Sequence, residues 1–156
     1  MTGPLQPHFE FAFSVQVTLQ PKIALGALTK GGDRYFVQIL DGHFEGPRIK
    51  GKVLPGGGDW AHIRPDGVMD FDARYNLQAD DGTFIYLQNR GFRWGSAEVM
   101  AKLARREPVD PSEYYMRVSP SFEVRQGPHD WLSKHLFFGI GDKIPSGNVI
   151  RYYQLL

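Results

Sequence analysis

Acids, arginines and aromatic residues in three short segments are the side chains of this sequence best suited to chemistry. The candidates are Asp59 and Trp60 after three consecutive glycines, then Asp72, Arg74 and Tyr75, and then Tyr115, Arg117 and Glu123. A carboxylate among apolar walls has a raised pKa and can act as a general base. Asp59, Asp72 or Glu123 would be that base. An arginine can stabilise a developing oxyanion, which gives Arg74 or Arg117 a role.

Whether these residues belong to a site depends on whether the polar faces of their strands point into the protein or to solvent. Asp72 and Arg74 are two positions apart, so they point to the same side of one strand. If that side faces the protein interior they are site residues, and if it faces solvent they form a weak surface pair. Arg117 is likewise either a site residue or half of a structural ion pair. Asp59 and Trp60 also have a structural alternative, in which they cap a turn and one end of the fold.

Two further motifs lack essential parts. Residues 46–52 match the G-x-x-x-x-G-K start of a phosphate-binding loop, but Val53 occupies the place of the magnesium-binding Ser or Thr, and a turn follows instead of a helix. Residues 43–45 copy the H-x-E of zinc deaminases without the cysteine pair that completes it. The chain has no cysteine, which excludes disulfides and iron–sulfur clusters. We therefore expect neither a metal nor a cofactor.

Charge and hydropathy argue against two classes of partner. The 18 Lys and Arg residues nearly balance the 17 Asp and Glu residues, whereas nucleic-acid binding requires clustered basic charge. No apolar run approaches the length of a transmembrane helix. Residues 1–7 lack the basic and apolar regions of a signal peptide. We expect a cytoplasmic protein that binds neither nucleic acid nor membranes.

The pattern of apolar residues predicts an all-β fold. Alternating or apolar segments that predict strands occur at 8–19, 23–28, 34–40, 43–54, 59–64, 68–78, 83–94, 114–124, 135–140 and 149–155. One helix is expected at 96–106, with Ser96 as its N-cap and prolines beyond its end, and a helical turn at 130–134. No linker divides the chain, so residues 1–156 are expected to form one domain. A closed antiparallel barrel fits best because it leaves no exposed strand edges, and a two-sheet sandwich is the alternative.

Several of these residues also occur in a known family. The matching residues are Gly46-Pro47-Arg48, Gly51, Val53-Leu54-Pro55-Gly56-Gly57, Asp59-Trp60, Asp72, Arg74-Tyr75, Asp81-Gly82, Tyr115, Arg117, Pro120, Phe122-Glu123 and Trp131-Leu132. They run in the family's order over nearly the whole chain, which resembles the DUF3237 (UPF0311) family of small bacterial and fungal β-barrel proteins. The resemblance implies a lipocalin-like barrel of about ten strands around a central cavity. It supplies no activity, and its motif residues, Arg48 included, enter only as candidate cavity residues.

We expect one small-molecule site inside this barrel. The residues expected to gather around it are Trp60, Asp72, Arg74, Tyr86, Arg117 and Glu123, and the candidate ligand contacts are Arg48, Trp60, Tyr75, Tyr86 and Tyr115. The leading hypothesis is a cofactor-independent isomerase, lyase, hydratase or cyclase acting on a small aromatic compound or secondary metabolite. The alternatives are a non-catalytic carrier or sensor of an apolar carboxylic acid, and a structural or interaction module. A homodimer is also left open.

Overall fold

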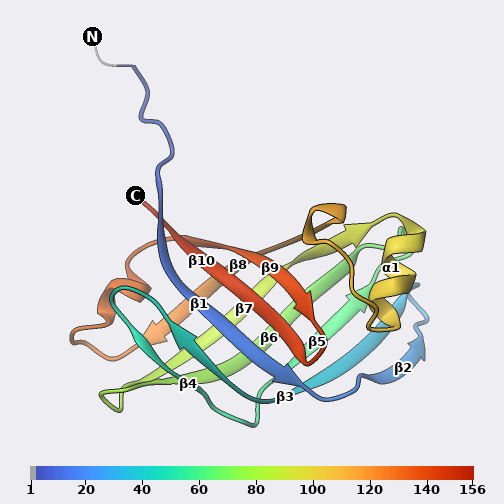
Figure 1. Ribbon diagram of the computed structural model, residues 1–156, viewed down its shortest axis with the longest axis horizontal. Coiled ribbons are helices and arrows are strands. Elements are labelled where there is room, and N and C mark those ends of the chain that lie inside the picture. The colour runs from blue at the N-terminus through green and yellow to red at the C-terminus, as the bar shows by residue number, and fades with distance from the viewer. Residues whose placement is uncertain (1–2) are drawn as a thin grey trace.

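The structure, a computed structural model, describes residues 3–156. Its strands are β1 (Phe9–Leu19), β2 (Ile23–Ala27), β3 (Asp33–Glu45), β4 (Lys50–Val53), β5 (Gly58–Ile63), β6 (Met69–Ala79), β7 (Phe84–Gly95), β8 (Tyr114–Val124), β9 (Phe137–Ile144) and β10 (Gly147–Leu155). The helical segments are α1 (Ala97–Ala104) and the single 3-10 turns η1 (Pro111–Glu113) and η2 (Asp130–Ser133). The strands form one sheet that curls into a barrel (Figure 1).

The barrel closes because β1 pairs with β10 on one side and with β3 on the other. From β10 the wall continues through β9, β8, β7 and β6. Strands β4 and β5 share the next position, since each pairs with β6 at a different height and both pair with β3. Among the described strands, β2 pairs with β3 alone and lies outside the ring. The predicted antiparallel β-barrel with one short helix is confirmed.

Strand β3 is longer than the sequence pattern predicts. The expected break between strands at 34–40 and 43–54, at the hairpin-like pair Asp41-Gly42, is wrong, because β3 continues to Glu45 and the chain reverses only afterwards. A Cβ at Gly42 would lie 2.1 Å from the carbonyl oxygen of Gln16 on β1. The glycine therefore permits the close β1–β3 approach that closes the barrel, and it does not make a turn.

A β-bulge in β1 separates aromatic residues that alternate in the sequence. Strict alternation over the expected strand 8–19 would place Phe9, Phe11 and Phe13 on one face. The register against β10 shifts between Phe11 and Phe13. As a result Phe13 is fully buried, whereas Phe9 and Phe11 are exposed on the outer wall.

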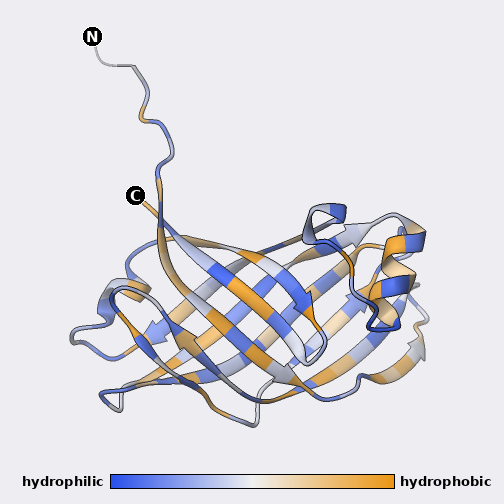
Figure 2. Ribbon diagram, viewed as in Figure 1, coloured by the Kyte–Doolittle hydropathy of each residue, from blue (hydrophilic) through white to orange (hydrophobic). Residues whose placement is uncertain are grey.

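Aromatic side chains fill one part of the barrel interior. Phe13 contacts Phe44, Phe122 and Tyr152 with ring centroids 5.2–5.8 Å apart, and Phe137 packs edge-on against Phe122. Along the strands, hydrophobic and hydrophilic positions alternate (Figure 2), as expected for walls with one face inside and one in solvent. This packed region supports the emptier part of the interior described below.

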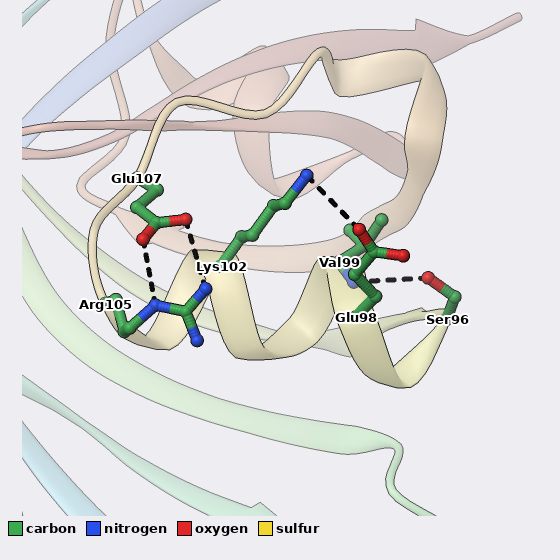
Figure 3. A network of polar contacts seen from close by, with 6 residues as sticks. All are labelled: Ser96, Glu98, Val99, Lys102, Arg105 and Glu107. Atoms are coloured by element: carbon green, nitrogen blue, oxygen red, sulfur yellow. Dashed lines mark hydrogen bonds and ion pairs between the residues drawn. The ribbon is translucent and has the colours of Figure 1, made fainter.

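Helix α1 lies beside β7 at one end of the barrel (Figure 1). The Ser96 Oγ accepts a hydrogen bond from the Val99 N–H at 3.1 Å, and Arg105 pairs with Glu107 beyond the last turn (Figure 3). Val99 and Leu103 are buried and anchor the helix to the barrel. Within residues 3–156, no helix has the length and apolar content needed to cross a membrane.

Candidate functional site

The end of the barrel near α1 and β2 contains a cavity of about 740 Å³. Its wall is largely apolar and includes Ile39, Phe71 and Met116. Its rim is formed by residues 20–22 between β1 and β2, residues 144–147 of the β9–β10 hairpin, and the end of α1 with the segment after it (Ala104, Arg106, Glu107 and Pro108). Small-molecule sites usually have volumes of about 300–1,000 Å³ and mostly apolar walls. The cavity therefore has the size and lining of such a site.

The three-glycine turn places Asp59 in this cavity. A Cβ at Gly57 would lie 2.4 Å from the Arg74 carbonyl oxygen on β6, and one at Gly58 would lie 2.4 Å from the Phe36 ring on β3. Only glycines allow β5 to enter between its two neighbours so closely. Strand alternation then directs Asp59 inward, where it lines the cavity with the other inward residues of β5.

Asp59 is the acid of the cavity whose ionisation is most perturbed. Burial and, to a smaller extent, the nearby charge of Asp72 raise the pKa of its carboxyl group from 3.8 to about 6. The Asp72 backbone N–H donates to Asp59 Oδ1 at 3.0 Å, and this bond and the charge of Arg93 act in the opposite direction on the pKa. No ion pair involves Asp59 in the described part of the chain. A carboxyl group with a pKa near 6 can accept and return a proton near neutral pH.

Arg93 is the buried cation of the same cavity. It points inward from β7 and is only 8% exposed. Its guanidinium lies 5.9 Å from the centre of the Phe71 ring, and its Nε has no hydrogen-bond partner among residues 3–156. Desolvation lowers the pKa of Arg93, although the group stays charged near neutral pH. An unpaired arginine in an apolar cavity is suited to an anionic or carbonyl oxygen of a ligand.

Buried polar atoms without partners are concentrated in the barrel interior. Across residues 3–156, all such side-chain atoms except His129 Nδ1 belong to inward-facing residues: Tyr75 Oη, Asn89 Oδ1, Arg93 Nε, Asn148 Oδ1 and Tyr152 Oη. Burial raises the pKa of both tyrosines, so their hydroxyls stay protonated. Leaving such a group unpaired costs about 1–3 kcal/mol. Tyr75 and Tyr152 act on each other's pKa, so the groups without a partner in the described chain that face the cavity are Asn89, Arg93 and Asn148, which a bound molecule would satisfy.

Two of the residues predicted from the sequence line the cavity. Asp59 and Tyr75 both face it, from β5 and β6. Trp60 does not: it is the next residue after Asp59, so it points outward, is 45% exposed and packs on Phe36. Asp59 and Trp60, which follow the glycines, therefore lie on opposite faces of the barrel wall.

The expectation that the remaining predicted residues surround the cavity is wrong. The polar faces of β6, β7 and β8 point to solvent, because their apolar faces fill the barrel. Asp72 and Arg74 form a partly exposed pair at 3.8 Å on the outer wall. Arg117 lies over the Tyr115 ring at 5.1 Å. The other outward residues are Tyr86, Glu123 and Arg48, the last of which lies 4.2 Å from the Trp131 ring.

Several residues that line the cavity were not predicted from the sequence, because the predicted candidates came from the polar faces of the strands. Asn89 and Arg93 share the inward face of β7 with Ile85 and Leu87. Lys143 on β9 and Asn148 on β10 are likewise polar groups that line the cavity. The available signal was a polar residue that interrupts an otherwise apolar face, because such a residue is costly unless it has a function or a partner.

The cavity offers few metal ligands. Across residues 3–156, no three His, Asp or Glu side chains converge as a metal site would require. Asp59 is the acidic residue among those that line the deep wall, and Glu107 at the rim already pairs with Arg105.

Comparisons with known proteins agree with this architecture. The chain is 33% identical over 155 residues to a UPF0311 protein of Clostridium acetobutylicum, covering 99% of this chain and 98% of that protein. A crystal structure of a conserved protein of unknown function from Rhodopseudomonas palustris superposes with a TM-score of 0.91 at 34% identity, over the full length of both chains. An enzyme from Penicillium herquei shares the fold with a TM-score of 0.75 at 21% identity, covering 100% of this chain and 99% of that one. The family model described as "Protein of unknown function (DUF3237)" matches residues 7–155, and the chain thus belongs to the DUF3237 family.

Proposed function

We propose that this protein is a cofactor-independent enzyme that moves protons on a small, largely apolar organic molecule. The reaction would be of the isomerase, lyase, hydratase or cyclase type, with Asp59 as the general base. The observation that carries this proposal is Asp59 itself. Its carboxyl group lies in an apolar cavity with a pKa of about 6, and it forms no ion pair within residues 3–156. A carboxylate fixed by an arginine would be too weak a base for this role.

The other polar groups of the cavity have complementary roles. Arg93 would stabilise negative charge that develops on a substrate oxygen when Asp59 removes a proton. The neutral hydroxyl of Tyr75, which lines the cavity, would donate a hydrogen bond to the same molecule. The apolar wall would hold an aromatic or alicyclic body and keep bulk water away from the reacting atoms.

Catalysis in this fold also has a precedent among the compared structures. The barrel from Penicillium herquei is described as an enzyme, and it covers nearly the same length of chain. That likeness shows only that a barrel of this shape can house a reaction. The choice of Asp59 and Arg93 comes from the cavity of the present protein.

A non-catalytic carrier of an apolar carboxylic acid is the second candidate. The observation that favours it is the buried, unpartnered Nε of Arg93, to which a carboxylate would bind. A carrier would use Arg93 and leave the basicity of Asp59 without a role. The two functions therefore differ in whether a bound molecule exchanges protons.

Proton exchange with solvent separates the two functions without knowledge of the natural substrate. Apolar ketones, β-diketones and phenols would be incubated with the protein in D₂O, and the loss of carbon-bound protons followed by ¹H NMR. We expect exchange that depends on Asp59, with a decrease of at least about 10²-fold in Asp59→Asn. The control is Asp80→Asn, which alters an acid on an exposed hairpin, 64% exposed. Compounds that bind without exchange, or that exchange equally in wild type and Asp59→Asn, would support the carrier and contradict the enzyme.

A further inference from the structure

Lys143 is an amine inside the cavity that the proposed reaction does not use. It lies near the end of β9 and lines the cavity close to the rim. Its backbone N–H donates to the Tyr114 hydroxyl at 2.8 Å, which fixes this part of β9 against β8. Its side chain is half-buried and forms no ion pair in the described part of the chain. This is an unusual position for a lysine, since long cationic side chains normally extend into water.

The charges around Lys143 disfavour its ammonium form. Arg93 from β7 and Arg106 from the segment after α1 are the cations that act on it, and Asp59 from β5 is the opposing anion. The neighbouring acid on its own strand, Asp142, already pairs with Arg151 at 2.6 Å. Burial, followed by the two arginines, lowers the pKa of Lys143 from 10.5 to about 8. A substantial fraction of this amine is therefore neutral near physiological pH.

The other lysines lack this environment. Lys50, Lys102 and Lys134 form exposed ion pairs with acids. Lys22 also lines the cavity, but its side chain is exposed and lies over the Tyr35 ring at 4.2 Å. Lys143 is thus distinguished from these lysines by its half-buried position in the cavity without an ion pair among the described residues.

We propose that Lys143 forms an imine with an aldehyde or ketone bound in the cavity, so that the substrates of the proposed enzyme are carbonyl compounds. The neutral Nζ adds to the carbonyl carbon, and its proton passes to the carbonyl oxygen to give a carbinolamine. Protonation of that hydroxyl releases one water and leaves the protonated imine, with no net oxidation or reduction. The protonated imine withdraws electrons, which acidifies the adjacent C–H bond.

This inference rests on the proposed function and keeps Asp59 as its base, while the protonated imine takes the place of the oxyanion at Arg93 as the acceptor of electrons. Asp59 faces the same cavity and would remove the acidified proton. Its pKa near 6 and that of Lys143 near 8 lie on either side of neutrality. Around pH 7 the carboxylate is therefore mostly ionised and about a tenth of the amine is neutral, which supplies both the base and the imine-forming nucleophile.

Reductive trapping tests the amine directly. The protein is incubated at pH 7 with benzaldehyde and sodium cyanoborohydride, which reduces an imine to a stable benzyl amine. Peptide mass spectrometry then measures the rate of labelling at each lysine. We expect Lys143 to react at least about 10-fold faster than the exposed Lys50, Lys102 and Lys134, because its neutral fraction is more than 100-fold larger and this outweighs its lower nucleophilicity. Equal or slower labelling of Lys143 would overturn the proposal.

Two variants separate this inference from the proposed function. Lys143→Arg keeps the charge but cannot form an imine, so the fast labelling should disappear while the thermal midpoint stays close to that of wild type. Asp59→Asn keeps the amine and should still be trapped at Lys143. Trapping without any Asp59-dependent proton exchange would refute the proposed base and leave the reactive amine. Exchange without trapping would refute only the role of Lys143.

Discussion

Replacing Asp59 with asparagine removes an ionisable group from the cavity while keeping its shape and an acceptor for the Asp72 N–H. In the folded protein the carboxyl pKa is about 6, against 3.8 for the ordinary group. Because the folded pKa is raised, the protonated form stabilises the protein below about pH 4, and this contribution is lost as the pH rises through about 6. At about 1.4 kcal/mol per pKa unit, the ionised Asp59 destabilises the fold by about 3 kcal/mol at neutral pH. We therefore expect Asp59→Asn to be more stable than wild type.

The assay is urea unfolding of wild type and Asp59→Asn between pH 4 and pH 8. The difference in free energy of unfolding should be small at pH 4, increase through pH 5–6 and level off above pH 7 at about 2–3 kcal/mol. Asp80→Asn, at a site 64% exposed, should differ from wild type by no more than about 0.5 kcal/mol at any pH. A variant that is less stable than wild type at pH 8, or a difference that does not depend on pH, would refute the reasoning. The first result would mean that Asp59 is stabilised in its charged form, and the second that its pKa is the same in the folded and unfolded states.

Three further substitutions test how the wall and helix position the site, each measured by urea unfolding. Arg74→Ala should cost no more than about 0.5 kcal/mol, because its pair with Asp72 at 3.8 Å lies on the outer wall; a loss of several kcal/mol would place the pair in the interior. Gly57→Ala should lower the free energy of unfolding by about 1–3 kcal/mol, since the new Cβ would lie 2.4 Å from the backbone of β6. An unchanged stability would contradict the close approach of this turn to β6. Ser96→Ala should cost about 1 kcal/mol through loss of the cap of α1, whereas Ser96→Thr should keep most of it.

The barrel could be predicted because its strands alternate so regularly. Strand β8 begins and ends at the predicted residues, and Ser96 caps α1 as expected. The errors occurred where long-range contacts override the local pattern. Gly42 resembles a hairpin residue, but it lies within β3 and allows the close pairing with β1. The bulge at Phe11 depends on pairing with β10. Neither contact is visible from neighbouring residues alone.

The candidate site was only partly predictable for a related physical reason. Alternation shows which residues share a face of a strand. Whether that face points into the barrel or to solvent depends on how the sheet closes. Asp59 and Tyr75 were found, whereas Asp72 and Arg74 proved to lie outside. Arg93 was not predicted, although it interrupts the apolar face of β7, because the candidate residues were taken from the polar faces of the strands. In this barrel, the candidate site is formed by polar residues that interrupt the otherwise apolar, inward faces of the strands.

The titration of Asp59 tests the central claim most directly. Protein labelled with ¹³C at the aspartate carboxyl carbons would be followed by NMR from pH 3 to pH 8, with Asp59→Asn used to assign the resonance. Our account predicts a resonance that titrates with a midpoint near 6 and is absent from the variant. A midpoint at or below about 4 would show that Asp59 is an ordinary or ion-paired carboxylate. That result would contradict a general base in this cavity.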